Sequence, residues 1–238
     1  EIPGNGKAPL RARLSIEPAR IVPVLIASSG EAPLAARFTA SVAVVWTLLS
    51  PKPAQPAGAT ARAPEVVTSD PVSLDGAAVS GNPQARIALI EYSDFQCPHC
   101  AEFARTTLPE IMRAYISTGK MLLAFRQLPL PMHPQAQKAA EASECAARQG
   151  KFWEIHDALF AMPSLSSDSI QKSAQGIGVD VSQFTRCLQE GQAGDEVRAD
   201  AATAKTLQVT GTPTFFIGVV MQGDHRVKVA RRLSGSQP

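Results

Sequence analysis

The chain has few of the residues on which several protein classes depend. Its 238 residues include 4 cysteines and 4 histidines, and the formal net charge is only +2. A charge so close to neutral, without a basic cluster, argues against a nucleic-acid-binding protein. Cys145 and Cys187 lie far from each other and from the other two cysteines, so the short ligand spacing of a structural zinc site is missing.

An apolar run long enough to cross a bilayer comfortably is also missing. The run from Phe38 to Leu49 follows Arg37, and its length suits the apolar core of a signal peptide. Small residues at 57–59 and 61–63 would provide a cleavage site. The mature chain would then begin near Pro64.

This pattern predicts three regions. Residues 1–36 are expected to be a disordered upstream extension, because proline and arginine are scattered through them and the first methionine of the chain is Met112. Residues 37–64 contain the signal peptide and a linker rich in proline and alanine, with an uncleaved membrane anchor through residues 38–50 as the alternative. Residues 65–238 form the folded domain.

Cys97-Pro98-His99-Cys100 is the most informative motif among the residues that are present. Residues 86–93 are an apolar run rich in strand formers, and a helical pattern follows the motif. Pro98 suits a first helical position, so Cys97 is placed near an N-cap, where free N–H groups and the helix dipole favour its thiolate. We expect Cys97 to be the exposed nucleophile and Cys100 the shielded resolving thiol. His99 would add a donor or a positive charge.

The same spacing has a second interpretation, as half of a metal site. Two further cysteine or histidine ligands at short spacing would be needed, and none is apparent in the sequence. The strand, turn and helix around the motif favour a reversible redox switch.

A second signal lies far downstream, in residues 209–217. Pro213 precedes an apolar strand, although proline cannot donate a hydrogen bond within a sheet. We expect a cis Thr212–Pro213 bond, which would leave backbone groups of Thr212 free to pair with an extended substrate strand.

With both motifs in place, the chain resembles the DsbA-like thiol:disulfide oxidoreductases of the thioredoxin superfamily over residues 85–233. Four segments in the same order carry the resemblance: Glu91-Tyr-Ser-Asp-Phe-Gln-Cys-Pro-His-Cys100, Phe125-Arg-Gln-Leu-Pro-Leu130 with His133-Pro134, Gly150-Lys-Phe-Trp-Glu-Ile-His156, and Gly211-Thr-Pro-Thr-Phe215. Together these segments are highly specific.

The resemblance implies an α/β chain with a thioredoxin fold and an inserted helical domain, and the sequence pattern agrees. A second strand is expected at 121–127, and an insertion at about 130–207 would contain helices at 134–149, 151–162, 167–177, 181–189 and 193–207. Two strands at 214–218 and 219–222 and a short helix at 224–233 would close the chain. Pro109 should kink the active-site helix.

The resemblance also implies roles for single residues. Glu91 matches a buried acid that assists proton transfer to Cys100; a solvent-facing strand position is the alternative, and Arg126 is a candidate partner. Thiolates of reduced exported proteins would attack oxidised Cys97 in the periplasm or another extracytoplasmic compartment. Reoxidation would require a membrane quinone-linked partner, and no cofactor or metal is required.

Cys145 and Cys187 would form a structural disulfide in such an oxidising compartment, with two separate buried thiols as the alternative. His133 and His156 are interpreted as packing or capping residues. The Pro-His pair between the cysteines favours an oxidase. An isomerase, a reductase, and a copper- or zinc-binding thiol module are the alternatives.

Overall fold

Residues 70–221 and 223–235 are described by the structure, which is a computed structural model. The chain separates into units 1–59 and 60–238, and all described residues belong to the second unit. The expected extension, signal peptide and linker, residues 1–64, therefore lie outside the described residues. Within the described part of the chain, no helix combines the length and the apolar character needed to cross a membrane.

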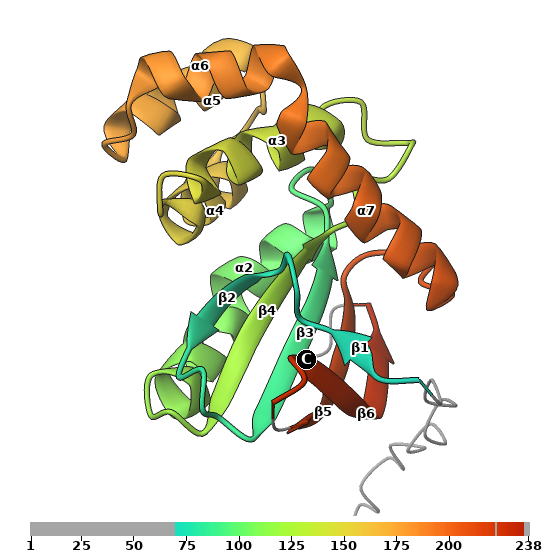
Figure 1. Ribbon diagram of the computed structural model, residues 1–238. Coiled ribbons are helices and arrows are strands. Elements are labelled where there is room, and N and C mark those ends of the chain that lie inside the picture. Colours follow the sequence, from blue (N-terminus) through green and yellow to red (C-terminus); the bar gives the residue numbers. More distant parts are fainter. Residues whose placement is uncertain (1–69, 222, 236–238) are drawn as a thin grey trace, which may run out of the picture. The chain divides into compact units, whose positions relative to one another are not determined.

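A six-stranded mixed sheet forms the centre of this unit (Figure 1). Its strands are β1 (Val72–Ser73), β2 (Ala78–Gly81), β3 (Ile87–Ser93), β4 (Met121–Gln127), β5 (Thr214–Met221) and β6 (Arg226–Ser234), in the spatial order β1-β6-β5-β3-β4-β2. The central pair, β3 and β4, is parallel, and every other neighbouring pair is antiparallel. Strands β3 and β4 are almost entirely buried, as their continuous apolar sequences predict.

Side chains alternate between the two faces of β3, and each face packs against a different helix. Ile90 and Tyr92 belong to a core cluster that includes Ala204 of helix α7 (Gln192–Thr206). Leu89 packs with Phe103 of helix α2 (Pro98–Ile111). Glu91 and Ser93, two and four residues beyond Leu89, therefore face the α2 side of the sheet.

Helix α2 continues through Pro109 and then passes into a short π-helix, η1 (Met112–Ile116). The N–H of Met112 reaches the carbonyl oxygens of both Leu108 and Pro109. Local π-helical turns are one of the usual ways in which a helix absorbs an interruption of its hydrogen bonds.

The inserted helices gather at the end of the sheet where α2 begins (Figure 1). They are α3 (Ala136–Ala147), α4 (Phe152–Ala161), α5 (Ser167–Gly176) and α6 (Val181–Glu190), followed by α7, which returns the chain to the sheet. Their positions confirm the predicted helices to within about two residues. Ser166 and Asp180 cap α5 and α6 by accepting hydrogen bonds from the N–H groups of Ser169 and Gln183.

The closing elements differ from the prediction. The expected pair of strands at 214–218 and 219–222 is the single strand β5, and the expected helix at 224–233 is the strand β6. Strand β5 continues through Gly218, which lies at a β-bulge. A Cβ added at Gly218 would be 2.3 Å from the Lys228 carbonyl oxygen, so the close approach of β6 requires a glycine here. In β6, buried Val227 and Val229 alternate with exposed residues, which is the period of a strand and not of the expected helix.

Candidate active site

The turn between β3 and α2 is held by one buried carboxylate, that of Asp94. Its Oδ1 accepts a hydrogen bond from the N–H of Gln96 at 2.7 Å, and its Oδ2 accepts one from the N–H of Leu130 at 2.8 Å. The Nδ1 of His133 is 2.7 Å from the same Oδ2. The carbonyl oxygen of Asp94 also accepts from the N–H of Cys97 at 3.0 Å. His133 thus helps to fix the turn before the cysteine motif. No local sequence pattern indicated the role of Asp94.

Cys97 is the N-cap of α2, with an extended backbone, and Pro98 follows at the first helical position, as expected. Both active-site cysteines are free thiols. Cys100 has 0% of its surface exposed and Cys97 has 4%, so the expectation of an exposed Cys97 was wrong. The turn and the Thr212 segment cover Cys97, which nevertheless lines an open pocket.

The pKa values of the two thiols are shifted in opposite directions. The pKa of Cys97 falls from 9.0 to about 5, chiefly because the Cys100 thiol donates a hydrogen bond to its sulfur, while partial burial acts in the other direction. Thr212 and the N–H groups of Cys100 and His99 lower this pKa further. Burial raises the pKa of Cys100, and its hydrogen bond to Cys97 adds to the rise. One stable thiolate therefore forms at Cys97.

His99 acts on Cys97 through its backbone rather than through its ring. The imidazole is largely exposed, with 68% of the side-chain surface accessible, and its Nδ1 is 4.0 Å from the Oε2 of Glu102. The contribution of His99 to the low pKa of Cys97 comes from its backbone N–H, and it is smaller than that of the Cys100 thiol. The expected donor is thus present, but it comes from the helix N-terminus.

The Thr212–Pro213 segment lies against Cys97. The peptide bond between Thr212 and Pro213 is cis, and the Cys97 Sγ is 3.4 Å from the Thr212 carbonyl oxygen. The Thr212 Oγ1 is buried and has no hydrogen-bond partner among the described residues. The Thr214 hydroxyl donates to the Gly211 carbonyl oxygen at 2.7 Å and fixes the bend before β5.

Glu91 is fully buried on the same side of the sheet as α2. Neither carboxyl oxygen has a hydrogen-bond partner among the described residues. Burial raises its pKa from 4.5 to about 7, and the nearby Ser93 hydroxyl partly offsets this rise. The Ser93 hydroxyl also lowers the pKa of Cys100, so the same side chain acts on both the carboxyl and the resolving thiol.

Arg126 is not the partner of Glu91, contrary to the expectation. Glu91 pairs in register with Phe125, so Arg126, one residue further along, points to the opposite face. There the guanidinium donates to Asp200 Oδ1 at 2.6 Å and to the carbonyl oxygens of Ser73 and Asp75. The sequence indicated neither Ser93 nor Asp200.

Three further residues that the sequence analysis singled out lie in the inserted helices. Cys145 of α3 and Cys187 of α6 are joined by a disulfide with an S–S distance of 2.04 Å. His156 is fully buried, and its ring contacts the rings of Phe95, Phe125 and Phe160. In the described residues, no three or more histidine, cysteine or acidic side chains are grouped so that they could hold a metal ion.

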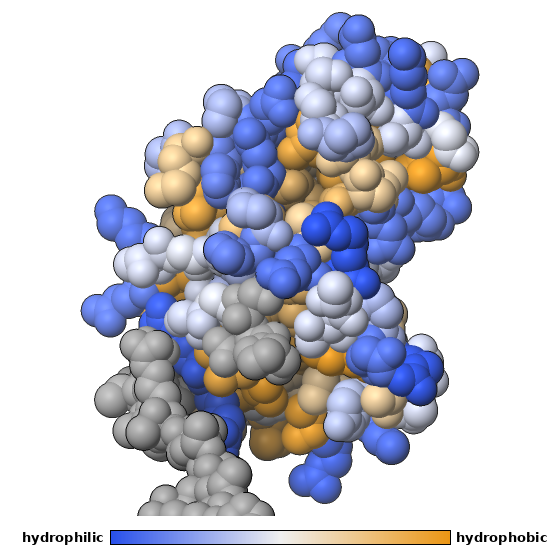
Figure 2. Space-filling model, turned by 180° about the vertical axis from the view of Figure 1, so that it is seen from behind, coloured by the Kyte–Doolittle hydropathy of each residue, from blue (hydrophilic) through white to orange (hydrophobic). Residues whose placement is uncertain are grey.

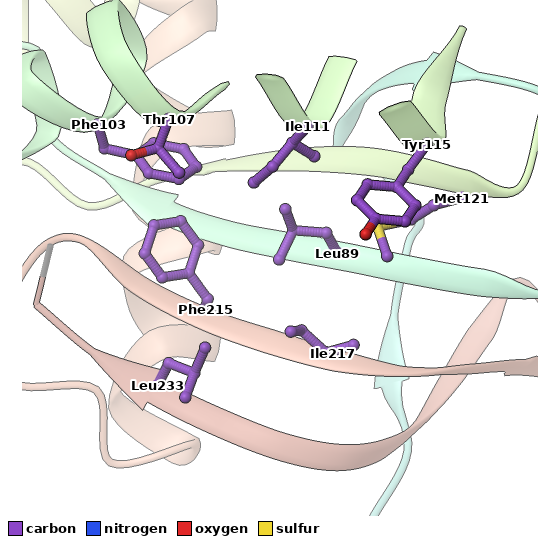
Figure 3. Close-up of a pocket in the computed structure, with 9 residues that line it drawn as sticks. All are labelled: Leu89, Phe103, Thr107, Ile111, Tyr115, Met121, Phe215, Ile217 and Leu233. Carbon is purple, nitrogen blue, oxygen red and sulfur yellow. The ribbon is translucent and has the colours of Figure 1, made fainter. Parts of the chain in front are cut away.

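An apolar groove with a volume of about 310 Å³ lies between α2 and the sheet (Figure 3). Phe103, Thr107 and Ile111 line it from the helix, facing Leu89, Phe215 and Ile217 on the strands. Figure 2 shows hydrophobic residues at the surface in the lower part of the molecule, bordered by hydrophilic ones. The groove begins beside Phe215, two residues beyond Pro213, and so lies close to the cysteine pair.

A second, more polar pocket of about 360 Å³ lies on the other side of α2, and Cys97 lines it. The site thus has a reactive thiol at the start of a helix, with a recess on each side of that helix. This arrangement can exchange a disulfide with a thiol of another molecule.

Comparison with known proteins gives a family match and several structural matches. A family model described as thioredoxin matches residues 73–231. The crystal structure of alpha-DsbA1 from Wolbachia pipientis is 28% identical, covers 70% of this chain and 86% of its own, and superposes with a TM-score of 0.60. A thioredoxin-like oxidoreductase from Silicibacter pomeroyi is 26% identical, covers 64% of this chain and 83% of its own, and gives a TM-score of 0.54.

A curated relative has a different description. The Na(+)/H(+) antiporter NhaA 3 of Salinispora tropica is 37% identical over 149 residues, which are 62% of this chain. The chain spans only 22% of the length of that relative. The match therefore concerns a small part of the antiporter.

Proposed function

Because this chain belongs to the thioredoxin family and is a DsbA-like thiol:disulfide oxidoreductase, we propose that it is an oxidase that introduces disulfide bonds into exported proteins. The observation that carries the proposal is the pKa of about 5 for Cys97. A thiolate that is stable at neutral pH favours the reduced form of the pair. The Cys97–Cys100 disulfide is then a strong oxidant toward other thiols.

The proposed reaction transfers two electrons from the substrate to the protein. A substrate thiolate attacks the Cys97 sulfur of the disulfide, and Cys100 leaves as a thiolate that takes up a proton. A second substrate thiolate then attacks the substrate sulfur of this mixed disulfide and displaces the Cys97 thiolate. The substrate leaves with a new disulfide, and the protein keeps a thiolate at Cys97 and a thiol at Cys100.

Residues around the pair have distinct roles in this proposal. Glu91, with a pKa of about 7, supplies the proton to Cys100, because a carboxyl with a pKa near the working pH both gives and takes protons readily. Backbone groups of Thr212, the residue before Pro213, hold the substrate in an extended form, since Pro213 has no N–H and its carbonyl oxygen already accepts from the N–H of Gly235. The apolar groove receives hydrophobic side chains that an unfolded substrate still exposes.

The cellular setting is part of the same proposal. We place the protein in the periplasm or another extracytoplasmic compartment, where its Cys145–Cys187 disulfide would persist. A membrane quinone-linked partner would take the two electrons from the reduced pair, and residues 38–50 would serve as a signal or as an anchor. Antiporter activity is not part of the proposal, because the matching segment is a small fraction of that relative.

The test uses the oxidised protein and a reduced, unfolded substrate protein, followed by counting of free thiols. We expect stoichiometric oxidation of the substrate by the unchanged protein and none by Cys97→Ser. Arg113→Gln, at an exposed position in η1, is the matched control and should react like the unchanged protein. Equal oxidation by Cys97→Ser would disprove the mechanism. Faster rearrangement of a scrambled substrate than oxidation of a reduced one would favour the isomerase.

A further inference from the structure

Helix α2 separates two recesses of different character. Phe103, Thr107 and Ile111 face the apolar groove. Pro98, Ala101 and Arg105, spaced three and four residues apart, form another stripe of the helix and line the polar pocket together with Cys97. Cys97, the reacting residue, therefore borders the polar pocket and is not among the residues that line the apolar groove.

The polar pocket offers hydrogen-bond donors. Gln96 and Gln135 both line it, and the side-chain oxygen of each is already occupied. Gln96 Oε1 accepts from the N–H of Gln135 at 2.6 Å, and Gln135 Oε1 accepts from the N–H of Leu165 at 3.2 Å. Each of these two amides also carries an NH2 group with two N–H donors.

Arg105 adds a positive charge to the same pocket. Its side chain is exposed, and one N–H donates to the Phe160 carbonyl oxygen at 3.3 Å, which leaves further guanidinium donors. No aspartate or glutamate lines the pocket. Asp157 lies with Arg105 beside a neighbouring recess, and its Oδ1 is 2.8 Å from the His156 Nδ1.

Building on the proposed function, we propose that this pocket binds an acidic side chain next to the reacting cysteine of the substrate. Adjacent Cα atoms are about 3.8 Å apart, so a residue that flanks a cysteine bonded to Cys97 falls within reach of a pocket that Cys97 itself lines. A carboxylate accepts hydrogen bonds and matches the planar guanidinium fork. Arg105 is then a specificity-determining residue, and substrates with lysine at that position react more slowly.

The test measures oxidation of three dithiol peptides by the oxidised protein. The peptides differ only in the residues that flank both cysteines, which are all Glu, all Lys or all Gln. Each turnover converts two peptide thiols into a disulfide and the Cys97–Cys100 disulfide into a dithiol, and acid-quenched samples give the rates. For each protein variant, the Glu-peptide rate is divided by the Lys-peptide rate. The intrinsic reactivities of the peptide thiols are the same for every variant, so they cancel when these ratios are compared.

We expect Arg105→Glu to lower this ratio by at least about fivefold. Residue 105 would then repel the Glu peptide that Arg105 attracts, and attract the Lys peptide that Arg105 repels. Arg113→Glu makes the same change of charge beyond the end of α2 and should leave the ratio within about twofold. A smaller change in Arg105→Glu, or an equal change in Arg113→Glu, overturns the assignment of the pocket. Failure of the unchanged protein to oxidise any of the three peptides overturns the proposed function itself.

Discussion

The side chain of Thr212 is one of the groups that lower the pKa of Cys97, and its hydroxyl is buried without a hydrogen-bond partner among the described residues. A hydrogen bond to a charged group contributes about 1.5–3 kcal/mol. We expect Thr212→Val to raise the pKa of Cys97 by about one unit, because valine keeps the shape of the side chain and removes the donor. Thiolate absorbance at 240 nm, recorded against pH, measures the change.

Thr106→Val is the matched control for this measurement. Thr106 lies on α2, the helix that Cys97 caps, and its hydroxyl donates to the Glu102 carbonyl oxygen in an exposed position. The control should leave the Cys97 titration unchanged. An unchanged titration in Thr212→Val would show that the hydroxyl does not stabilise the thiolate.

Glu91 makes stability depend on pH in a defined direction. Its pKa is about 7 in the folded protein and 4.5 for an ordinary carboxyl, so the folded state holds this proton over a window in which the unfolded state has lost it. Stability therefore falls as the pH rises from about 4.5 to 7. Glu91→Gln removes this effect and should raise the free energy of unfolding by up to ~3 kcal/mol at pH 8, with little gain at pH 4.5.

Urea unfolding of both proteins at the two pH values, in the same redox state, checks this prediction. Glu110→Gln is the control, because Glu110 is exposed and pairs with Arg113 on η1. A gain of the same size at pH 4.5 and pH 8 would contradict a buried, titrating carboxyl at position 91.

At the scale of elements, a buried ion pair joins β4 to α7. The side chains of Arg126 and Asp200 are 6% and 8% exposed, and Asp200 Oδ2 also accepts from the N–H of Gln127 at 2.8 Å. Asp200→Ala should lower the free energy of unfolding by about 3–5 kcal/mol, because it leaves the buried Arg126 cation without its counter-ion and the buried N–H of Gln127 without a partner.

Chemical denaturation measures this loss, with Asp195→Ala as the control on the same helix. Asp195 is exposed and pairs with Arg198, so its removal should cost less than about 1 kcal/mol. Similar losses in the two variants would show that the pair does not hold α7 to the sheet.

Local sequence patterns predicted the elements whose hydrophobic period is clear, and missed those that depend on distant partners. Strands β3 and β4 and all five inserted helices followed from period and composition. Strands β1 and β2, with 2 and 4 residues, are too short for a visible period. In β6, exposed arginines concealed the alternation, and only pairing with β5 shows it.

The same limit applies to the site. The cysteine motif and Pro213 are local signals, and the structure brings Cys97, Cys100 and Thr212 together. The partner of Arg126 lies 74 residues away in the sequence, so the face of the strand had to be known before that partner could be identified. Ser93 carries no motif of its own, and only the alternation along β3 places it beside Glu91.

At the scale of the whole molecule, the Cys145–Cys187 disulfide links two inserted helices across 42 residues. Replacing both cysteines by alanine should lower the free energy of unfolding by about 4 kcal/mol, because the unfolded chain loses a long closed loop. Thermal or urea unfolding gives the change. The Cys97 titration should be unaltered in the double variant, and a loss below about 1 kcal/mol would show that the bridge is not stabilising.

The direction of electron flow is the central claim, and the equilibrium of residues 65–238 with glutathione buffers tests it most directly. Mass spectrometry of alkylated peptides reads the Cys97–Cys100 pair separately from Cys145 and Cys187. The account predicts a potential well above that of thioredoxin, which is about −270 mV, and near the strongly oxidising value of about −120 mV. A potential at or below that of thioredoxin would contradict the account, because the pair would then reduce the disulfides that it is proposed to form.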